Sequence, residues 1–299
     1  MNDRSVLSDA VIGTSVDQLF HYTWRDVILY NISVGAGPAD LTYVYEKNLQ
    51  AIPTFAVIPC TAAFGMEPDI GRSDMPSSHI EGLRTEGTIH MDQKLVLRGP
   101  LPVSGTFRIH KELTDLYDRG PGRGAKLIET VTAFDENGEV LFVNEVGSLN
   151  RWGGGFGGRP LPAPDVQMPD RAPDLAVQGS FPVNAAVLYR LTGDLNDIHV
   201  DPEAAQAARL GHPILHGLCS MGYACRMLID ALLPGQPQRV RSMENQFRAM
   251  VTPGESFCLQ VWRCTAPGSD DAGTSAALYR LTAENDGRSI IDFGRITWV

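Results

Sequence analysis

Residues 189–202 read YRLTGDLNDIHVDP, and residues 213–219 read PILHGLC. The first segment ends in an aspartate-proline pair at 201–202, which is typical of a helix start because aspartate caps the first turn and proline fits its first position. We expect this short helix to end at Gly211. Residues 194–199 should then lie in a loop between a strand and the helix, where functional groups are commonly held.

A similar spacing between a tyrosine-led motif and a proline recurs in the first half of the chain. YNISVG at residues 30–35 leads to Pro53, 23 residues after its tyrosine, whereas YRLTG at residues 189–193 leads to Pro213 after 24. Each proline precedes an apolar stretch that we expect to be a helix, followed by a turn and by alternating runs typical of strands. The segments concerned are the apolar stretches 54–66 and 214–233, the turns 101–105 and 251–255, and the alternating runs 127–132 and 257–262.

One helix and several long strands, twice over, predict an α+β unit that has been duplicated and fused. A chance coincidence of common proline and glycine positions is the alternative. Between the halves, residues 153–160 read GGGFGGRP, and more prolines follow. This composition cannot sustain a helix or a central strand. We therefore expect a linker at 153–175 between a first repeat at 1–152 and a second at 176–299.

Composition excludes several classes of protein. With 299 residues, of which 43% are hydrophobic and 20% charged, the chain can bury a real core. A net charge of −10 without a basic run argues against a nucleic-acid partner. The most apolar stretch, residues 51–65, is too short for a bilayer and contains prolines, so we expect no membrane partner. Five cysteines without a CxxC pair or a visible signal peptide predict reduced thiols and a cytoplasmic location.

Reactive side chains are densest after residue 193. Asp194 and His199 lie in one predicted loop, where a carboxylate and an imidazole can hold a water molecule, take its proton and return a proton elsewhere. Asn196 between them can orient that water. The alternative is a capped turn with a structural aspartate and a buried histidine. We expect Gly217 to begin the second apolar helix, where its N–H has no partner within the helix and can donate to an oxygen that gathers negative charge. The alternative is that this glycine only permits close packing of the helix against the sheet.

The histidines also raise the question of a metal site. His212 and His216 have the i, i+4 spacing of zinc ligands, and His199 lies nearby in the sequence. Pro213 breaks the helical geometry between them, however, and no cysteine or glutamate completes a known pattern. We therefore expect no metal.

The segments 189–202 and 213–219 closely resemble the hydratase-2 motif of the (R)-specific enoyl-CoA hydratases. This MaoC-like family includes the hydratase domain of peroxisomal multifunctional enzyme type 2. DLTYVYE at residues 40–46, PTFAVIP at 53–59 and the glycines of 155–158 extend the resemblance over nearly the whole chain. The resemblance implies a double hotdog fold, in which a long helix is wrapped by a curved antiparallel sheet, twice.

The resemblance also implies roles for single residues. Asp194 and His199 would hold the catalytic water, assisted by Asn196. The Gly217 N–H would polarise the thioester carbonyl. Contacts to the substrate or its CoA would come from five residues, namely Glu46, His90, Met91, Arg119 and Phe247.

Three positions depart from the family pattern. Met91 follows His90 where a glycine is expected, and Asp197 replaces the usual proline of the loop. Arg119 stands where a lysine is common, which retains a cation for the CoA phosphates. None of these changes affects Asp194 or His199.

The implied reaction is the reversible hydration of a trans-2-enoyl-CoA to the (3R)-3-hydroxyacyl-CoA, with no cofactor beyond the CoA of the substrate. GAGP at residues 35–38 replaces the Asp/His loop in the first half, so one active site per chain is expected. A homodimer is compatible with the fold. The alternatives are a hotdog acyl-CoA thioesterase and a non-catalytic acyl-CoA-binding protein. The sequence does not identify the acyl group.

Overall fold

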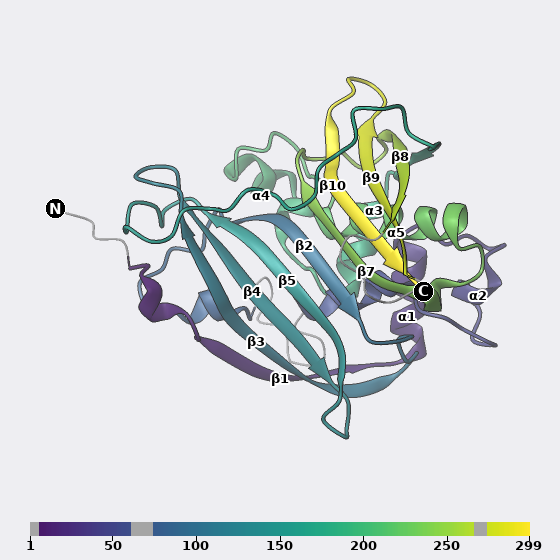
Figure 1. Cartoon of the computed structure of the whole chain (residues 1–299), viewed down its shortest axis with the longest axis horizontal. Helices are drawn as coiled ribbons and strands as arrows, with labels where there is room; N and C mark the ends of the chain where they lie inside the picture. Colours follow the sequence, from purple (N-terminus) through teal and green to yellow (C-terminus); the bar gives the residue numbers. More distant parts are fainter. Residues whose placement is uncertain (1–5, 61–73, 266–273) are drawn as a thin grey trace.

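Ten strands pair into one continuous antiparallel sheet, in the order β1-β3-β4-β5-β2-β7-β10-β9-β8-β6 (Figure 1). The computed structural model describes residues 6–60, 74–265 and 274–299. The strands of the first half are β1 (Ser15–Tyr22), β2 (Ile89–Leu97), β3 (Gly105–Asp118), β4 (Ala125–Phe134) and β5 (Val140–Asn150). Those of the second half are β6 (Leu175–Ser180), β7 (Val240–Phe247), β8 (Ser256–Thr265), β9 (Ser275–Ala283) and β10 (Ser289–Trp298).

Each half places its five strands in the same order. From the outer edge inward, the first half runs β1-β3-β4-β5-β2 and the second β6-β8-β9-β10-β7, and the halves meet where β2 pairs with β7. The alternating runs 127–132 and 257–262 lie in β4 and β8, as expected. The α+β double hotdog architecture predicted from the sequence is therefore confirmed.

The helices are shorter and more varied than the strands. The α-helices are α1 (Trp24–Ser33), α2 (Leu41–Val44), α3 (Ala185–Tyr189), α4 (Pro202–Ala207) and α5 (Gly217–Leu232). The 3-10 helices are η1 (Asp9–Val11), η2 (Pro53–Cys60), η3 (Pro76–His79), η4 (Arg190–Thr192), η5 (Asp197–His199) and η6 (Pro237–Arg239). Among the described helices, none combines the length and the apolar character that crossing a membrane requires.

Of the long helix expected in each half, the described residues contain only the one in the second half. There α5 extends over 16 residues and is buried along most of its length. The described part of the first apolar stretch is instead the 3-10 helix η2, whose eight residues are all buried; residues 61–66 of the expected helix lie outside the described residues. Pro59 within η2 has no N–H to donate, which disfavours a regular α-helix at this place. Over the described residues 54–60 of the helix predicted at 54–66, the chain therefore forms a 3-10 helix rather than a long α-helix.

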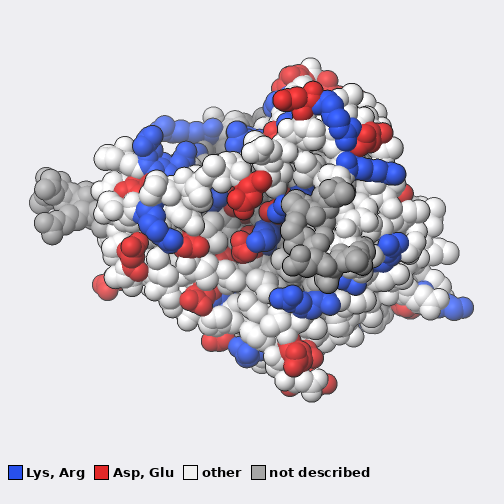
Figure 2. All heavy atoms as spheres, viewed as in Figure 1, with Lys and Arg blue, Asp and Glu red and all other residues white. Residues whose placement is uncertain are grey.

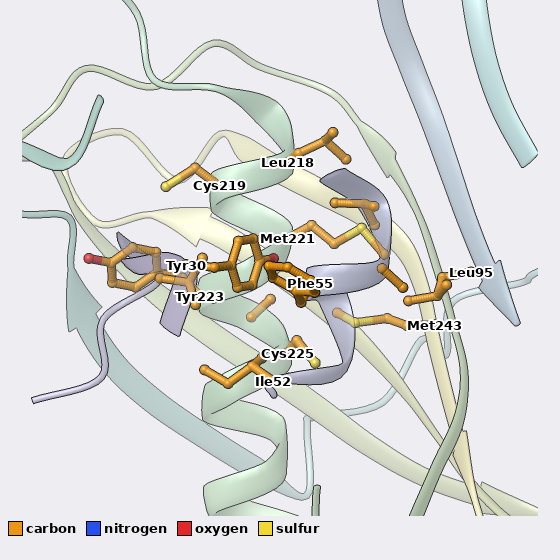
Figure 3. Close-up of a cluster of buried hydrophobic side chains, with 14 of the residues drawn as sticks. Tyr30, Ile52, Phe55, Leu95, Leu218, Cys219, Met221, Tyr223, Cys225 and Met243 are labelled. Carbon is orange, nitrogen blue, oxygen red and sulfur yellow. The ribbon is translucent and has the colours of Figure 1, made fainter. Parts of the chain in front are cut away.

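The two halves share one hydrophobic core (Figure 3). Phe55 of η2 packs over α5, near Met221, and its ring lies 5.5 Å from the ring of Tyr30 in an edge-to-face arrangement. Leu95 of β2 and Met243 of β7 close this core from the sheet. Burial of a side chain of this size stabilises the fold by roughly 1.5–3 kcal/mol. The repeats are therefore held together by side-chain packing as well as by strand pairing.

The glycine-rich segment after β5 is bound to the first repeat. The Asp118 carboxylate accepts hydrogen bonds from the N–H groups of Gly155 at 2.8 Å and Gly157 at 2.7 Å, and these bonds lower the pKa of Asp118. Gly154 lies so close to the β3–β4 turn that a Cβ on it would be 2.4 Å from the carbonyl oxygen of Gly120. The glycines are thus needed for close approach of two backbones, not only for a break between the halves.

Two local expectations near the second repeat's loop need correction. Helix α4 begins as predicted, with the Asp201 side chain accepting from Glu203 N–H, but it ends at Ala207 rather than at Gly211. Arg209, with a φ of 61°, already turns the chain away. The helices α3 and η4, not a strand, precede the loop that contains Asp194, so the prediction of a strand there was wrong.

Substitution of Gly154 tests the close approach of these backbones. Gly154→Ala would place a methyl group against the carbonyl oxygens of the β3–β4 turn, and overpacking of this kind costs about 1–3 kcal/mol. We expect a clear drop in Tm. Gly99→Ala is the matched control, because a Cβ at Gly99 meets nothing within 4 Å. Equal melting of both variants would contradict the packing described here.

Candidate active site

The loop between η4 and η5 brings Asp194 and His199 to the same place. Gly193, with a φ of 129°, ends η4 and turns the chain into the loop. Asn196 then caps η5, because its side-chain oxygen accepts from Ile198 N–H, while its own N–H donates to the Asp194 carboxylate at 3.3 Å. Asn196 therefore organises the loop through its backbone and side chain. Asp197 is exposed.

His199 is buried and held in one tautomer. Its Nδ1–H donates to the carbonyl of Ile214 at 2.8 Å, which leaves Nε2 with a free lone pair. Burial lowers the pKa of His199, and the nearby charge of Asp194 opposes this effect only in part. A neutral imidazole with an unprotonated Nε2 is the form that can accept a proton from water.

His216 lies directly against His199. The two rings stack with centroids 3.6 Å apart and an interplanar angle of 24°. The Nε2–H of His216 donates to the backbone carbonyl of Asp194 at 3.2 Å. Burial lowers the pKa of His216 well below its usual value, with the neighbouring His199 adding to the effect. The sequence analysis considered His216 only as a possible metal ligand. Its position directly before Gly217, at the predicted start of a helix, could have indicated that it lies next to the site.

The same three residues do not suit a metal ion in this arrangement. One ligand atom each from Asp194, His199 and His216 lies within 4.8 Å of the others. A metal must lie near the plane of each coordinating imidazole, however, and two nearly parallel rings 3.6 Å apart cannot direct their lone pairs at one point. His212 is exposed and its Nδ1–H donates to the carbonyl of Pro213, at 3.1 Å, so it lies outside this cluster.

Gly217, Phe247 and His90 contact one another near this cluster. Gly217 is the first residue of α5, so its N–H has no partner within the helix. A Cβ on Gly217 would lie 3.2 Å from the Phe247 ring, and that ring meets His90 edge to face at 5.1 Å. Burial lowers the pKa of His90, opposed in part by the charges of Asp92 and Asp194. The first repeat, through His90, therefore contributes to the site of the second.

Three further residues were predicted to contact the substrate or its CoA, namely Met91, Arg119 and Glu46. Met91 is half-buried at a break in strand register between His90 and Asp92, a bulge that can redirect the His90 side chain. Arg119 is exposed in the β3–β4 turn, at the upper left of Figure 1, where basic side chains gather in Figure 2. Glu46 is exposed in the loop after α2. Among the interactions of the described residues, none joins Arg119 or Glu46 to Asp194 or His199.

Comparison with known proteins matches both halves. Residues 20–151 match the MFE-2 hydratase 2 N-terminal domain, and residues 165–284 match the MaoC like domain. The chain is 34% identical to an enoyl-CoA hydratase (ChsH3) of Mycobacterium tuberculosis over 85% of this chain and 88% of that protein. It is 32% identical to a probable enoyl-CoA hydratase 2 of Dictyostelium discoideum, with 92% and 90% covered.

The chain belongs to the MaoC-like hydratase 2 family. A solved member with a similar fold is the MaoC-like dehydratase from Phytophthora capsici, at 27% identity and a TM-score of 0.81, with 98% of both chains covered. The resemblance read from residues 189–202 and 213–219 is thereby confirmed. The individual site residues remain predictions that the geometry described above makes specific.

The buried histidines should make the protein less stable at mildly acidic pH. A histidine with a lowered pKa in the folded protein takes up its proton more readily when unfolded, so stability falls as the pH drops below about 6.5. For a histidine that stays neutral down to pH 5 the loss is up to about 2 kcal/mol. In urea unfolding at pH 7 and pH 5, His199→Gln should lose less stability than the wild type.

His212→Gln serves as the control for this experiment, because His212 is exposed and should leave the wild-type pH dependence unchanged. An identical loss of stability in the wild type and in His199→Gln would show that His199 is not held neutral by the fold.

Proposed function

We propose that this chain catalyses the reversible hydration of trans-2-enoyl-CoA to (3R)-3-hydroxyacyl-CoA. The observation that carries the proposal is the convergence of Asp194 and His199 in one loop, with the Nε2 lone pair of His199 free and the N-terminus of α5 alongside. The names of the two relatives, both enoyl-CoA hydratases, support the same reaction class.

In the proposed reaction, a water molecule is held between the Asp194 carboxylate and His199 Nε2. His199 takes one proton from this water while the oxygen adds to C3 of the enoyl group. The Asp194/His199 pair returns that proton to C2 from the same face, so the elements of water are added without any further reactant. Asp194 also stabilises the imidazolium that forms, because its charge favours protonated His199.

Gly217 supplies the complementary electrostatic contribution. Negative charge gathers on the thioester oxygen as the water oxygen bonds to C3. The Gly217 N–H at the start of the 16-residue helix α5 would donate to that oxygen, supported by the helix dipole. The Phe247 ring beside Gly217 would exclude water from this hydrogen bond.

The same arrangement argues against the alternatives. A thioesterase would direct the water at the thioester carbon rather than at C3, and the two relatives, both named enoyl-CoA hydratases, favour addition at C3. A silent binding protein has no use for a buried, neutral His199 with a fixed tautomer. A single active site per chain, a cytoplasmic location and a homodimer also belong to this proposal.

One assay separates the three candidate functions. Crotonyl-CoA is incubated with the protein while the enoyl absorbance and the free thiol are followed in parallel. The proposal predicts loss of absorbance without thiol release. Thiol release would indicate hydrolysis, and no change in either signal would favour a binding protein; both results would overturn the proposal.

Asp194 and Asp197 form a matched pair for testing the mechanism. Asp194→Asn keeps the volume but removes the charge, so kcat should fall by roughly 10²–10⁴-fold, the range typical of general acid–base catalysis, with little change in KM. Exposed Asp197→Ala should stay within a few-fold of the wild type, with folding of both variants checked by thermal melting. If Asp194→Asn stayed active while Asp197→Ala lost activity, Asp197 rather than Asp194 would be the carboxylate that holds the water, and the assignment would be wrong.

Arg119 tests the proposed CoA contact. CoA is strongly anionic and the chain carries a net charge of −10, so binding needs local cations. Arg119→Ala should raise KM with little change in kcat, and the difference should shrink at high salt because screening weakens the ion pair. Lys47→Ala, which removes another exposed cation, is the control. An unchanged KM in Arg119→Ala would place the CoA elsewhere.

A further inference from the structure

We propose that His216 is a positioning residue that holds the Asp194/His199 pair in its reactive arrangement. The inference rests on the proposed hydratase function, which assigns His216 no part. Three separate contacts of the His216 ring carry it, to His199, to the backbone of Asp194 and to Tyr189.

The first contact fixes the plane of the catalytic imidazole. The His199 ring lies flat on the His216 ring at 3.6 Å, so rotation of His199 about its side-chain bonds would drive it into His216. The hydrogen bond from His199 Nδ1–H to Ile214 fixes the same ring along its edge. Together the two contacts leave His199 one orientation, with Nε2 directed away from both.

The second contact fixes the carboxylate side of the pair. His216 Nε2–H donates to the Asp194 carbonyl, 22 residues earlier in the chain. His216 is also the N-cap residue of α5, so this bond ties the start of the catalytic loop to the start of the helix that carries Gly217. The His216 side chain thus fixes the relative positions of three groups, the His199 base, the Asp194 carboxylate and the Gly217 N–H. Misplacement of such groups by about 1 Å can cost on the order of 10²-fold in rate.

The third contact prevents His216 itself from moving. The ring of Tyr189, fully buried, lies 4.9 Å from the His216 ring, and Tyr189 in turn lies 6.0 Å from Tyr30 of α1. This row of aromatic rings connects the catalytic base to the core shared by both repeats (Figure 3 shows Tyr30 in that core).

His216 also controls the environment in which His199 titrates. The groups that face it are the ring of Tyr189 of α3, the charge of Arg190 of η4, the backbone carbonyl of Asp194 and the ring of His199 of η5. Its buried Nδ1 has no hydrogen-bond partner in the described structure, so a second proton there would be unsatisfied and the ring stays neutral. The neutral ring shields one face of His199 from water. Removal of the ring would admit water and let the pKa of His199 rise towards its usual value.

Two variants separate the contacts of His216. His216→Phe keeps a flat ring for stacking but loses the donor to Asp194, whereas His216→Gln keeps an N–H donor but loses the stacking ring. We expect both to lower kcat by on the order of 10–10²-fold with KM nearly unchanged. His216→Gln should also move the acidic limb of the pH–rate profile to higher pH, and His216→Phe should leave it near the wild-type position. His212→Gln, four residues away and exposed, should match the wild type throughout.

Wild-type kcat in both variants, a loss confined to KM, or an unmoved acidic limb in His216→Gln would overturn the proposal. If either variant fails to fold, nitrogen-15 NMR of the wild-type imidazoles decides. The proposal requires His216 protonated at Nε2 and His199 at Nδ1 near neutral pH; any other tautomer pair overturns it. This readout does not depend on activity, so a wild-type protein that fails to hydrate crotonyl-CoA would reject the proposed function without deciding the role of His216.

Discussion

The pairing of β2 with β7 is the constraint on which the rest of the structure depends. Backbone partners from Asp92↔Gln246 to Val96↔Ser242 join the two halves into one sheet. Each half thereby covers an edge strand of the other, which would otherwise expose unpaired backbone groups. Lys94 and Glu244 are register partners at the junction, and each pairs with a charged side chain of its own half, Lys94 with Glu145 and Glu244 with Arg295. The junction also places His90, at the start of β2, beside Phe247, at the end of β7.

The two repeats have the same strand order but different tasks. The second repeat keeps the long helix α5 and the Asp/His loop at its start, whereas the described part of the corresponding stretch in the first repeat is the 3-10 helix η2. The first repeat supplies half of the shared core and one imidazole, His90, to the site of the second. Among the described residues, the Asp194/His199 pair of the second repeat therefore lies close to a side chain of the first, His90.

The sequence predicted those features that depend on local patterns. The alternation in β4 and β8, the Asp201 cap of α4 and the Gly217 start of α5 follow from neighbouring residues alone. The features that it missed depend on contacts between distant segments. The composition around Gly154 predicted a linker but not its close approach to Gly120, because that contact exists only in the folded chain. For His216 the sequence offered only a metal role, which was rejected, because its stacking on His199 exists only once the loop packs against the start of α5.

The central claim is that one Asp/His pair, on one side of the substrate, performs the hydration. In the proposed mechanism, Asp194 and His199 deliver water from a single loop and therefore to one face of the double bond. The most direct test hydrates crotonyl-CoA and offers the product to hydroxyacyl-CoA dehydrogenases of opposite stereospecificity, with NADH as the signal. The account predicts that only the (R)-specific dehydrogenase forms NADH. Substantial NADH from the (S)-specific enzyme would contradict it.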